Sequence, residues 1–366
     1  MIVRTIKINY DWGIIMANKV TIQDIADALG VSRNTVSKAI NNTGILADAT
    51  REKVLAKAVE MGYKQFSYAN SMEDFLDKAS AKKPLATGDI AFFSGTFLDN
   101  SHFASTMLDK FQYEITQLGY GLTMQRITPE NVEALSLPAS FNKERTQGII
   151  CVEMFNQKYC EMLCELNIPI LFVDAPVGSY SHQLAGDVLL MDNTTGIFTI
   201  IAEMKKRGIK EIGFIGESNH CRSFFERYVA FRNAMFLNGL EIDEKYCLTD
   251  IHKHGPEYFA CLFEELSKLE KLPELFICAN DFVAIDLVNC LKIQKHSYPE
   301  DVMICGFDDS AESKVMTPAL TTCHIHSQIM GFTAANLLVS RIEQPDLNYR
   351  TVYTEANLIL RGSTKD

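Results

Sequence analysis

Short apolar runs alternate with helical segments along most of the chain, and this rhythm constrains the fold more than any other feature. From Thr87, helical stretches separate the apolar runs DIAFFSG, GLTMQRI, GIICVE and PILFVDA. After residue 186 the rhythm starts again with LLMDN, EIGFIGE, LFICAN and VMICGFDDS. Strands that alternate with crossover helices form parallel sheets covered on both faces. The two series therefore predict an α/β body made of two doubly wound lobes.

Polar side chains follow several of these predicted strands. Ligands of doubly wound folds bind outside the carboxyl ends of the strands, so we expect a ligand cleft there. Carboxylates and a guanidinium can pair with the vicinal hydroxyls of a sugar, and an aromatic ring can cover its C–H face. Each acid could instead cap a helix. The candidate ligand-binding residues are Ser94, Phe103, Asp174, Arg227, Asp281 and Asp308, with Arg227 and Asp281 the strongest of them.

The N-terminal part of the chain has a different pattern, typical of three short helices. Thr21 can cap a first helix that ends at Gly30, Ser32 can cap a second, and a third runs through TREKVLAKAVEM. The apolar spacing in the first two helices is that of a helix-turn-helix. On the second helix, a set of polar side chains is left facing outward: Arg33, Asn34, Ser37, Lys38 and Asn41.

This polar face has two interpretations. Arginine and lysine can donate to guanine, asparagine can pair with adenine, and hydroxyls can hold phosphates, so the face suits double-stranded DNA. A solvated face on a minor pair of helices would show the same spacing.

The distribution of charge favours DNA binding by the N-terminal part alone. The chain has a net charge of -11, which by itself argues against a nucleic-acid partner. Residues 16–65, however, contain seven Lys and Arg against five Asp and Glu, a net charge of +2. Residues 66–366 carry -14. A mildly basic head on an acidic body is compatible with DNA contact through the head.

The segment VTIQDIADALGVSRNTVSKAINNTGILADATREKVLAKAVEMGY resembles, nearly residue for residue, the headpiece of the lactose-repressor (LacI/GalR) family of bacterial transcriptional regulators. The resemblance implies a sequence-specific transcriptional regulator, most simply a repressor. By the same resemblance a small effector, of the sugar class, would control it. It also implies roles for two sets of residues: Arg33, Asn34 and Lys38 would read bases, and Thr21, Ser32, Thr35 and Asn41 would contact the DNA backbone.

The resemblance continues through the body of the chain. CANDFVAIDLVNCL, RYVAF, SHFA, GFDDS, TPALTT and LILRGST are similar to segments of the family's periplasmic-binding-protein-like domain. Asp286 and Ala230 stand where two glycines are usual, and Gly208-Ile209 stands where glycine-histidine is common. These departures affect the expected shape of the ligand site more than the expected fold.

The segment between head and body departs further from the family's pattern. In the family a hinge helix places a leucine as a wedge in the minor groove, and in YKQFSYANSM the apolar Met72 stands at that position. Glu73, Asp74 and Asp77 follow, and carboxylates meet a strongly negative potential near the minor groove. Either the hinge helix forms with these acids turned outward, or it bends DNA poorly. A third interpretation is an ordinary amphipathic linker helix without DNA contact.

These patterns divide the chain into four parts. Residues 1–15 are an extension before the family's usual start, with Met16 as an alternative initiator. A headpiece at 16–65 and a linker at 66–83 precede the body at 84–366. Within the body we expect lobe 1 at about 84–178 plus 307–335, and lobe 2 at about 179–306 plus 336–366.

Other classes of function find little support in the sequence. No phosphate-binding loop or nucleophile elbow is present, and the scattered cysteines and histidines lack a zinc-site spacing, so we expect no cofactor, no metal and no enzymatic activity. With no long apolar run or signal peptide, we expect a cytoplasmic protein without a membrane partner. A palindromic operator requires a homodimer. Two alternatives remain: control by a protein corepressor, and a solute-binding protein without a DNA role.

Overall fold

The computed structural model of the chain describes residues 20–41, 48–61, 63, 88–95, 102–253 and 255–364. It separates into two compact units, Met1–Pro84 and Leu85–Asp366, which we describe one at a time. We call the described part of the first unit the headpiece and that of the second the body. Met72 and the rest of the predicted hinge lie outside the described residues.

The headpiece contains helices α1 (Ile22–Leu29), α2 (Arg33–Asn41) and α3 (Asp48–Glu60). Thr21 caps α1 through a reciprocal pair of hydrogen bonds with Asp24, and Gly30 ends it with a left-handed φ of 65°. The side chain of Ser32 accepts a hydrogen bond from the backbone N–H of Thr35 at 3.0 Å and so caps α2. The three helices enclose a small apolar core made of Ile25, Ala26, Val36, Ala39, Ile40, Val54 and Ala58.

Lobe 1 of the body is built on a six-stranded parallel sheet in the order β11-β5-β4-β3-β1-β2. Its strands are β1 (Asp89–Ser94), β2 (Gly121–Arg126), β3 (Thr146–Val152), β4 (Ile170–Val173), β5 (Asp187–Met191) and β11 (Thr351–Thr354). Its helices are α5 (His102–Gln117), α6 (Pro129–Ala134), α7 (Gln157–Cys164), η2 (Val177–Tyr180) and α13 (Ser327–Glu343).

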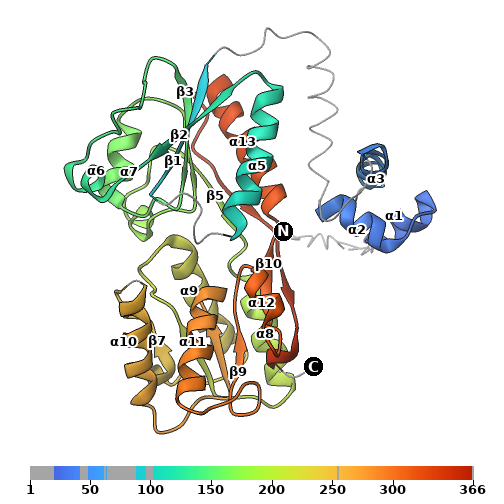
Figure 1. Cartoon of the computed structure of the whole chain (residues 1–366), viewed down its shortest axis with the longest axis vertical. Helices are drawn as coiled ribbons and strands as arrows, with labels where there is room; N and C mark the ends of the chain where they lie inside the picture. Colours follow the sequence, from blue (N-terminus) through green and yellow to red (C-terminus); the bar gives the residue numbers. More distant parts are fainter. Residues whose placement is uncertain are drawn as a thin grey trace, which may run out of the picture. The chain divides into compact units, whose positions relative to one another are not determined.

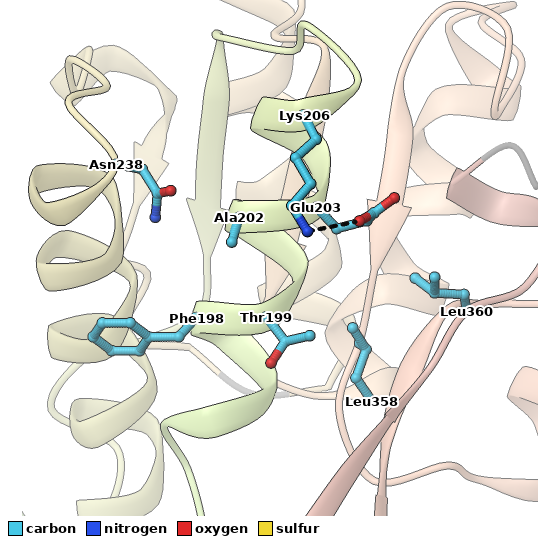
Figure 2. Close-up of a pocket in the computed structure, with 8 residues that line it drawn as sticks. All are labelled: Phe198, Thr199, Ala202, Glu203, Lys206, Asn238, Leu358 and Leu360. Carbon is cyan, nitrogen blue, oxygen red and sulfur yellow. Dashed lines mark ion pairs between the residues drawn. The ribbon is translucent and has the colours of Figure 1, made fainter.

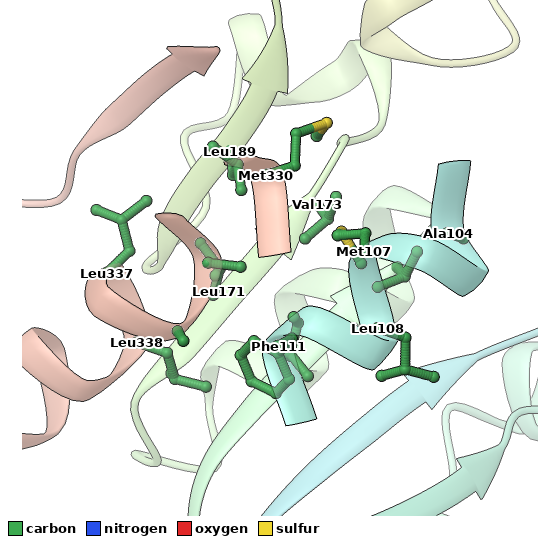
Figure 3. Close-up of a cluster of buried hydrophobic side chains, with 14 of the residues drawn as sticks. Ala104, Met107, Leu108, Phe111, Leu171, Val173, Leu189, Met330, Leu337 and Leu338 are labelled. Atoms are coloured by element: carbon green, nitrogen blue, oxygen red, sulfur yellow. The ribbon is translucent and has the colours of Figure 1, made fainter. Parts of the chain in front are cut away.

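Both faces of this sheet are buried, as the apolar runs predict. Ile90 and Phe92 of β1 face one hydrophobic core and Ala91 and Phe93 face the other, because successive side chains of a strand point to opposite sides. Figure 3 shows the first core, where side chains of α5 and α13 meet those of β4 and β5. Gly331 allows these helices to approach closely, since a Cβ there would lie 2.3 Å from the carbonyl oxygen of Met107.

Lobe 2 has a four-stranded parallel sheet in the order β7-β6-β8-β9. Figure 1 labels its two edge strands, β7 and β9. Its strands are β6 (Ile212–Ile215), β7 (Cys247–Leu248), β8 (Leu275–Cys278) and β9 (Met303–Cys305). Its helices are α8 (Thr195–Lys206), α9 (Arg222–Leu237), η3 (Glu244–Tyr246), α10 (Pro256–Ser267), α11 (Asp281–Ile293) and α12 (Ala311–Val315). Helices α8 and α9 cover one face, and α10 and α11 cover the other.

Within the described residues of the body, the chain passes between the lobes three times: from β5 to α8, from β10 (Thr322–Ile325) to α13, and from β11 to β12 (Ala356–Ile359). Strands β10 and β12 pair with each other in a separate antiparallel ribbon. The predicted lobe bounds were wrong at β5 and β11, which both fall in ranges assigned to lobe 2 but pair within the sheet of lobe 1. An apolar strand fits either sheet by composition, and its pairing partner decides where it lies.

In the described part of the body and headpiece, no helix is long and apolar enough to span a bilayer.

Candidate functional site

The polar face of α2 is accessible for contact with a partner. The side chains of Arg33 and Asn34 are exposed, and that of Lys38 is partly exposed, while Val36 and Ile40 on the opposite side are buried in the headpiece core. Folding therefore turns these cationic and amide groups outward, as the sequence predicts.

The hydroxyls proposed to contact the DNA backbone already have local partners. The side chain of Thr21 bonds Asp24, and the Ser32 hydroxyl lies 2.8 Å from that of Thr35. A hydroxyl has a single O–H to donate, so Thr21 would have to release Asp24 before it could donate to a phosphate oxygen, whereas the Ser32–Thr35 pair uses only one of its two O–H groups. The side chain of Asn41 is outside the described part of the structure.

Arg227 is the central cation of the body. It lies in the second turn of α9, is 2% exposed, and its guanidinium carbon stacks 3.6 Å from the ring centroid of Phe307. Its Nε donates to Oδ1 of Asn193 at 3.0 Å, and its NH1 donates to the backbone carbonyl of Ala279 at 2.6 Å. These contacts hold the guanidinium plane rigidly, which suits paired hydrogen bonding to a ligand.

Asp308 faces Arg227 without a close hydrogen bond to it, since its Oδ1 lies 3.8 Å from NH1. Burial raises the pKa of Asp308 to about 8, against the influence of Arg227, and the negative charges of Asp281, Glu153 and Asp174 raise it further. The residue has a φ of 118°, a strained conformation of the kind that clusters at functional sites. The carboxyl group of Asp308 can therefore accept a hydrogen bond from a ligand, or donate one when protonated, beside the guanidinium of Arg227.

Asp281 and Asp174 lie near this pair but are committed to the protein itself. The carboxylate of Asp281 accepts from the backbone of Ser310 at 2.8 Å and from the hydroxyl of Thr322 at 2.6 Å. That of Asp174 accepts from the backbone N–H of Ser223 at 3.2 Å, at the start of α9. Burial raises the pKa of both carboxyls despite these hydrogen bonds. Asp281 thus anchors the loop around residue 310, and Asp174 joins lobe 1 to α9.

The remaining two candidates are Ser94 and Phe103. Ser94 ends β1, is 2% exposed, and accepts a hydrogen bond from Ile127 through its backbone carbonyl. Phe103 lies in the first turn of α5, and its side chain is outside the described part of the structure.

Three residues beside Arg227 were missed in the sequence. Asn193 follows the strand LLMD, Glu226 precedes Arg227 in FERYVAF, and Phe307 precedes Asp308 in GFDD. The sequence offered one signal for each of them: Asn193 follows a predicted strand, and Glu226 and Phe307 are next to candidate residues in the chain. An amide that bridges two side chains, or a ring that supports a guanidinium, can be recognised only once the fold places them together.

One surface cavity of the body lies apart from the candidate ligand-binding residues. Among the described residues, no group of three or more His, Cys, Asp and Glu could hold a metal ion. His324 bonds Asp309 and His326 bonds Asn357. Figure 2 shows the surface cavity, which lies on lobe 2 and has a volume of about 430 Å³. None of the candidate ligand-binding residues lines it. Its lining consists of Phe198, Thr199, Ala202, Glu203, Lys206, Asn238, Leu358 and Leu360.

The geometry defines a class of protein: a helix-turn-helix headpiece followed by a two-lobed binding-protein body. The family model "Bacterial regulatory proteins, lacI family" matches residues 21–65, and the model "Periplasmic binding protein-like domain" matches residues 201–364. The chain belongs to the LacI/GalR family of bacterial transcriptional regulators. It is a DNA-binding regulator and not an enzyme.

Full-length relatives and solved structures agree with this assignment. The transcriptional repressor PurR of Haemophilus influenzae is 28% identical over 355 residues, covering 94% of this chain and 98% of its own. The regulator RegA of Clostridium saccharobutylicum is 24% identical over 346 residues, covering 94% of this chain and 99% of its own. The lac repressor dimer bound to operator and the anti-inducer ONPF has a TM-score of 0.63 at 19% identity, and covers 94% and 99% of the two chains.

The complex of the regulator CelR with cellobiose has the same fold. Its TM-score is 0.64 at 20% identity, and it covers 94% of this chain and 99% of that chain.

Proposed function

We propose that the chain is a cytoplasmic repressor whose homodimer binds a palindromic operator, and that a small polyhydroxyl ligand held at Arg227 and Asp308 controls this binding. The observation that carries the ligand site is the buried guanidinium of Arg227, stacked on Phe307 and fixed by Asn193 at the junction of the two lobes. A rigid cation with a facing acid is a site prepared for a ligand rather than a solvated surface.

The chemistry of this pair suits a sugar. A guanidinium presents parallel N–H donors and a carboxyl group presents two oxygens, so together they can serve the donors and acceptors of adjacent hydroxyls. The buried ring of Phe307 supports the guanidinium from behind. Similar structures contain cellobiose, D-xylulofuranose and ribose, which is consistent with a sugar here.

On the DNA side, α2 would enter the major groove with Arg33, Asn34 and Lys38 against base edges. Thr21, Ser32, Thr35 and Asn41 would contact phosphates and fix the orientation of the helix. One headpiece covers only a half-site, so a two-fold dimer is needed to read a palindrome.

Ligand and operator would be coupled through the relative orientation of the lobes. A ligand can shift this equilibrium only by binding the two orientations with different affinity, and a coupling of about 1 to 3 kcal/mol is typical of such proteins. The site lies where the lobes meet, since α9 of lobe 2 contacts Asp174 and Ala175 of lobe 1.

We expect a sugar found in a thermal-shift screen of sugars and nucleosides to lose about tenfold in affinity when Arg227 is replaced by lysine. Lysine keeps the charge but cannot form the paired hydrogen bonds of a planar guanidinium. Affinity measured by calorimetry on the full chain tests this. At a concentration one hundred times its dissociation constant, a ligand should stabilise the wild-type protein by about 2.7 kcal/mol.

The matched control is Arg232→Lys, on the same helix. Arg232 is partly exposed and pairs with Glu244, outside the proposed site, so this change should leave ligand affinity unaltered. Equal losses in both variants, or no stabilisation by any compound of the screen, would contradict the proposed ligand site.

A further inference from the structure

Glu226 has an unusual set of partners for a side chain that is nine-tenths buried. Its Oε1 accepts from the hydroxyls of Tyr180 and Tyr353, each at 2.7 Å, and from Nε of Arg222 at 2.9 Å. Its Oε2 accepts from Nδ2 of Asn193 at 2.8 Å. A carboxylate with four donors is fully satisfied, and hydrogen bonds to an ionised acceptor are the stronger kind.

These partners come from both lobes. Glu226 and Arg222 lie on α9 of lobe 2, which reaches the junction of the lobes (Figure 1). Tyr353 lies on β11, the edge strand of the lobe 1 sheet, and Tyr180 ends η2, between β4 and β5 of lobe 1. The carboxylate of one lobe is therefore bonded to two tyrosines of the other.

Arg222 reinforces the same contact. Its NH2 donates to the hydroxyl of Tyr353 at 2.9 Å, and its guanidinium carbon lies 4.6 Å from the ring centroid of Tyr180. Burial, together with the nearby carboxylate of Glu226, raises the pKa of both tyrosines. Both phenols consequently stay protonated at neutral pH and remain hydrogen-bond donors.

Asn193 connects this cluster to the proposed ligand site. Its Nδ2 donates to Glu226 and its Oδ1 accepts from Nε of Arg227. Asn193 also lies in the first crossing between the lobes, from β5 to α8. A ligand that moves the guanidinium of Arg227 must move the Asn193 amide or break one of its two hydrogen bonds.

We infer that Glu226, Tyr180 and Tyr353 form a latch that holds the two lobes in the observed arrangement, with Asn193 linking the latch to Arg227. Glu226 and Asn193 are positioning residues in this scheme, because they act through Arg227 and the two tyrosines. The latch itself is a property of the body alone, and only its link to a ligand rests on the proposed function.

The test is to remove the two phenol oxygens with the double variant Tyr180→Phe/Tyr353→Phe in the full-length protein, without any ligand. The readout is hydrogen exchange at Arg222 and Ser223, whose amides donate across the junction to the carbonyl of Ala175 and the carboxylate of Asp174. We expect these two amides to exchange about tenfold faster, since losing hydrogen bonds to a charged acceptor increases local opening. Amides within β1 and β6 should keep their rates.

The matched control is Tyr349→Phe. Tyr349 lies close to Tyr353 in the chain, but it is 48% exposed and its ring contacts Arg341 rather than Glu226. Unchanged exchange at Arg222 and Ser223 in the double variant would overturn the latch. So would an equal increase in β1 and β6, which would show general destabilisation.

A sugar from the thermal-shift screen tests the link to the ligand. It should slow exchange at Arg222 and Ser223 in the wild-type protein, and slow it less in the double variant, where Asn193 no longer acts on an intact latch. An equal effect in both proteins would refute the link. Because the first measurement needs no ligand, failure of the latch and failure of the proposed ligand site give different results.

Discussion

Replacing Arg33 and Lys38 together by alanine should weaken specific operator binding about a hundredfold or more. Each good contact to a base edge contributes about 1 to 3 kcal/mol of discrimination, and the two side chains lie on the outward face of α2. Binding to a symmetric duplex selected from genomic fragments, compared with a scrambled duplex at several salt concentrations, measures the effect. The preference for the symmetric duplex should fall along with the affinity.

The control is Lys53→Ala, which removes an exposed cation from α3 instead of α2. It should reduce binding to both duplexes by a similar small factor, as the loss of a nonspecific charge does. If the double variant also weakened both duplexes equally, Arg33 and Lys38 would be phosphate contacts, and base reading by this pair would be wrong. Circular dichroism would confirm that the core around Val36 and Ile40 is intact.

The local features of the headpiece and body could be predicted because they depend on near neighbours in the chain. Thr21 and Ser32 cap their helices through residues only three positions away. The apolar runs became strands buried on both faces, as the alternation of Ile90 and Ala91 between two cores shows. The lobe to which β5 and β11 belong could not be predicted, because it depends on pairing with distant strands.

The difference between near neighbours and distant partners also explains which parts of the candidate ligand site could be predicted. Arg227 stands in a family motif, and in the structure it lies at the carboxyl end of the lobe 2 sheet, beside Asp308. Asp281 follows a strand just as a ligand-binding acid would, yet its oxygens bond Ser310 and Thr322. The residue type after a strand is local information. Which hydrogen bonds it forms depends on a loop about thirty residues away, which no local pattern reveals.

Replacing Asp187 by asparagine should destabilise the body by about 3 to 5 kcal/mol, a typical result of breaking a buried ion pair from one side. The Asp187 side chain is 1% exposed and lies between two guanidiniums, with Oδ1 2.8 Å from NH2 of Arg341 and Oδ2 2.6 Å from NH2 of Arg350. It also accepts from the backbone of Arg350 at 2.8 Å. Because these residues join β5 to α13 and to the start of β11, the change weakens the edge of the lobe 1 sheet. Denaturant unfolding of the full chain measures the loss.

The pH dependence of unfolding provides a second measurement. Burial alone would raise the pKa of Asp187, but the hydrogen bonds from Arg341 and Arg350 outweigh it and hold the pKa below its ordinary value of 3.8. A carboxyl group with a lowered folded pKa contributes its stability above the unfolded pKa, and this stability is lost as the pH falls through the folded pKa. The Asp187→Asn protein should therefore lose less stability on acidification below about pH 4 than the wild type does.

Asp89→Asn is the matched comparison, because Asp89 pairs at 3.2 Å with Arg145, whose side chain is 72% exposed. A solvated pair of this kind contributes about 0 to 1 kcal/mol, so the variant should unfold close to the wild type. Equal effects at positions 89 and 187 would mean that the two guanidiniums relax to solvent when Asp187 is neutralised. In that case the α13–β11 connection would be held by its backbone and apolar contacts rather than by the buried charge.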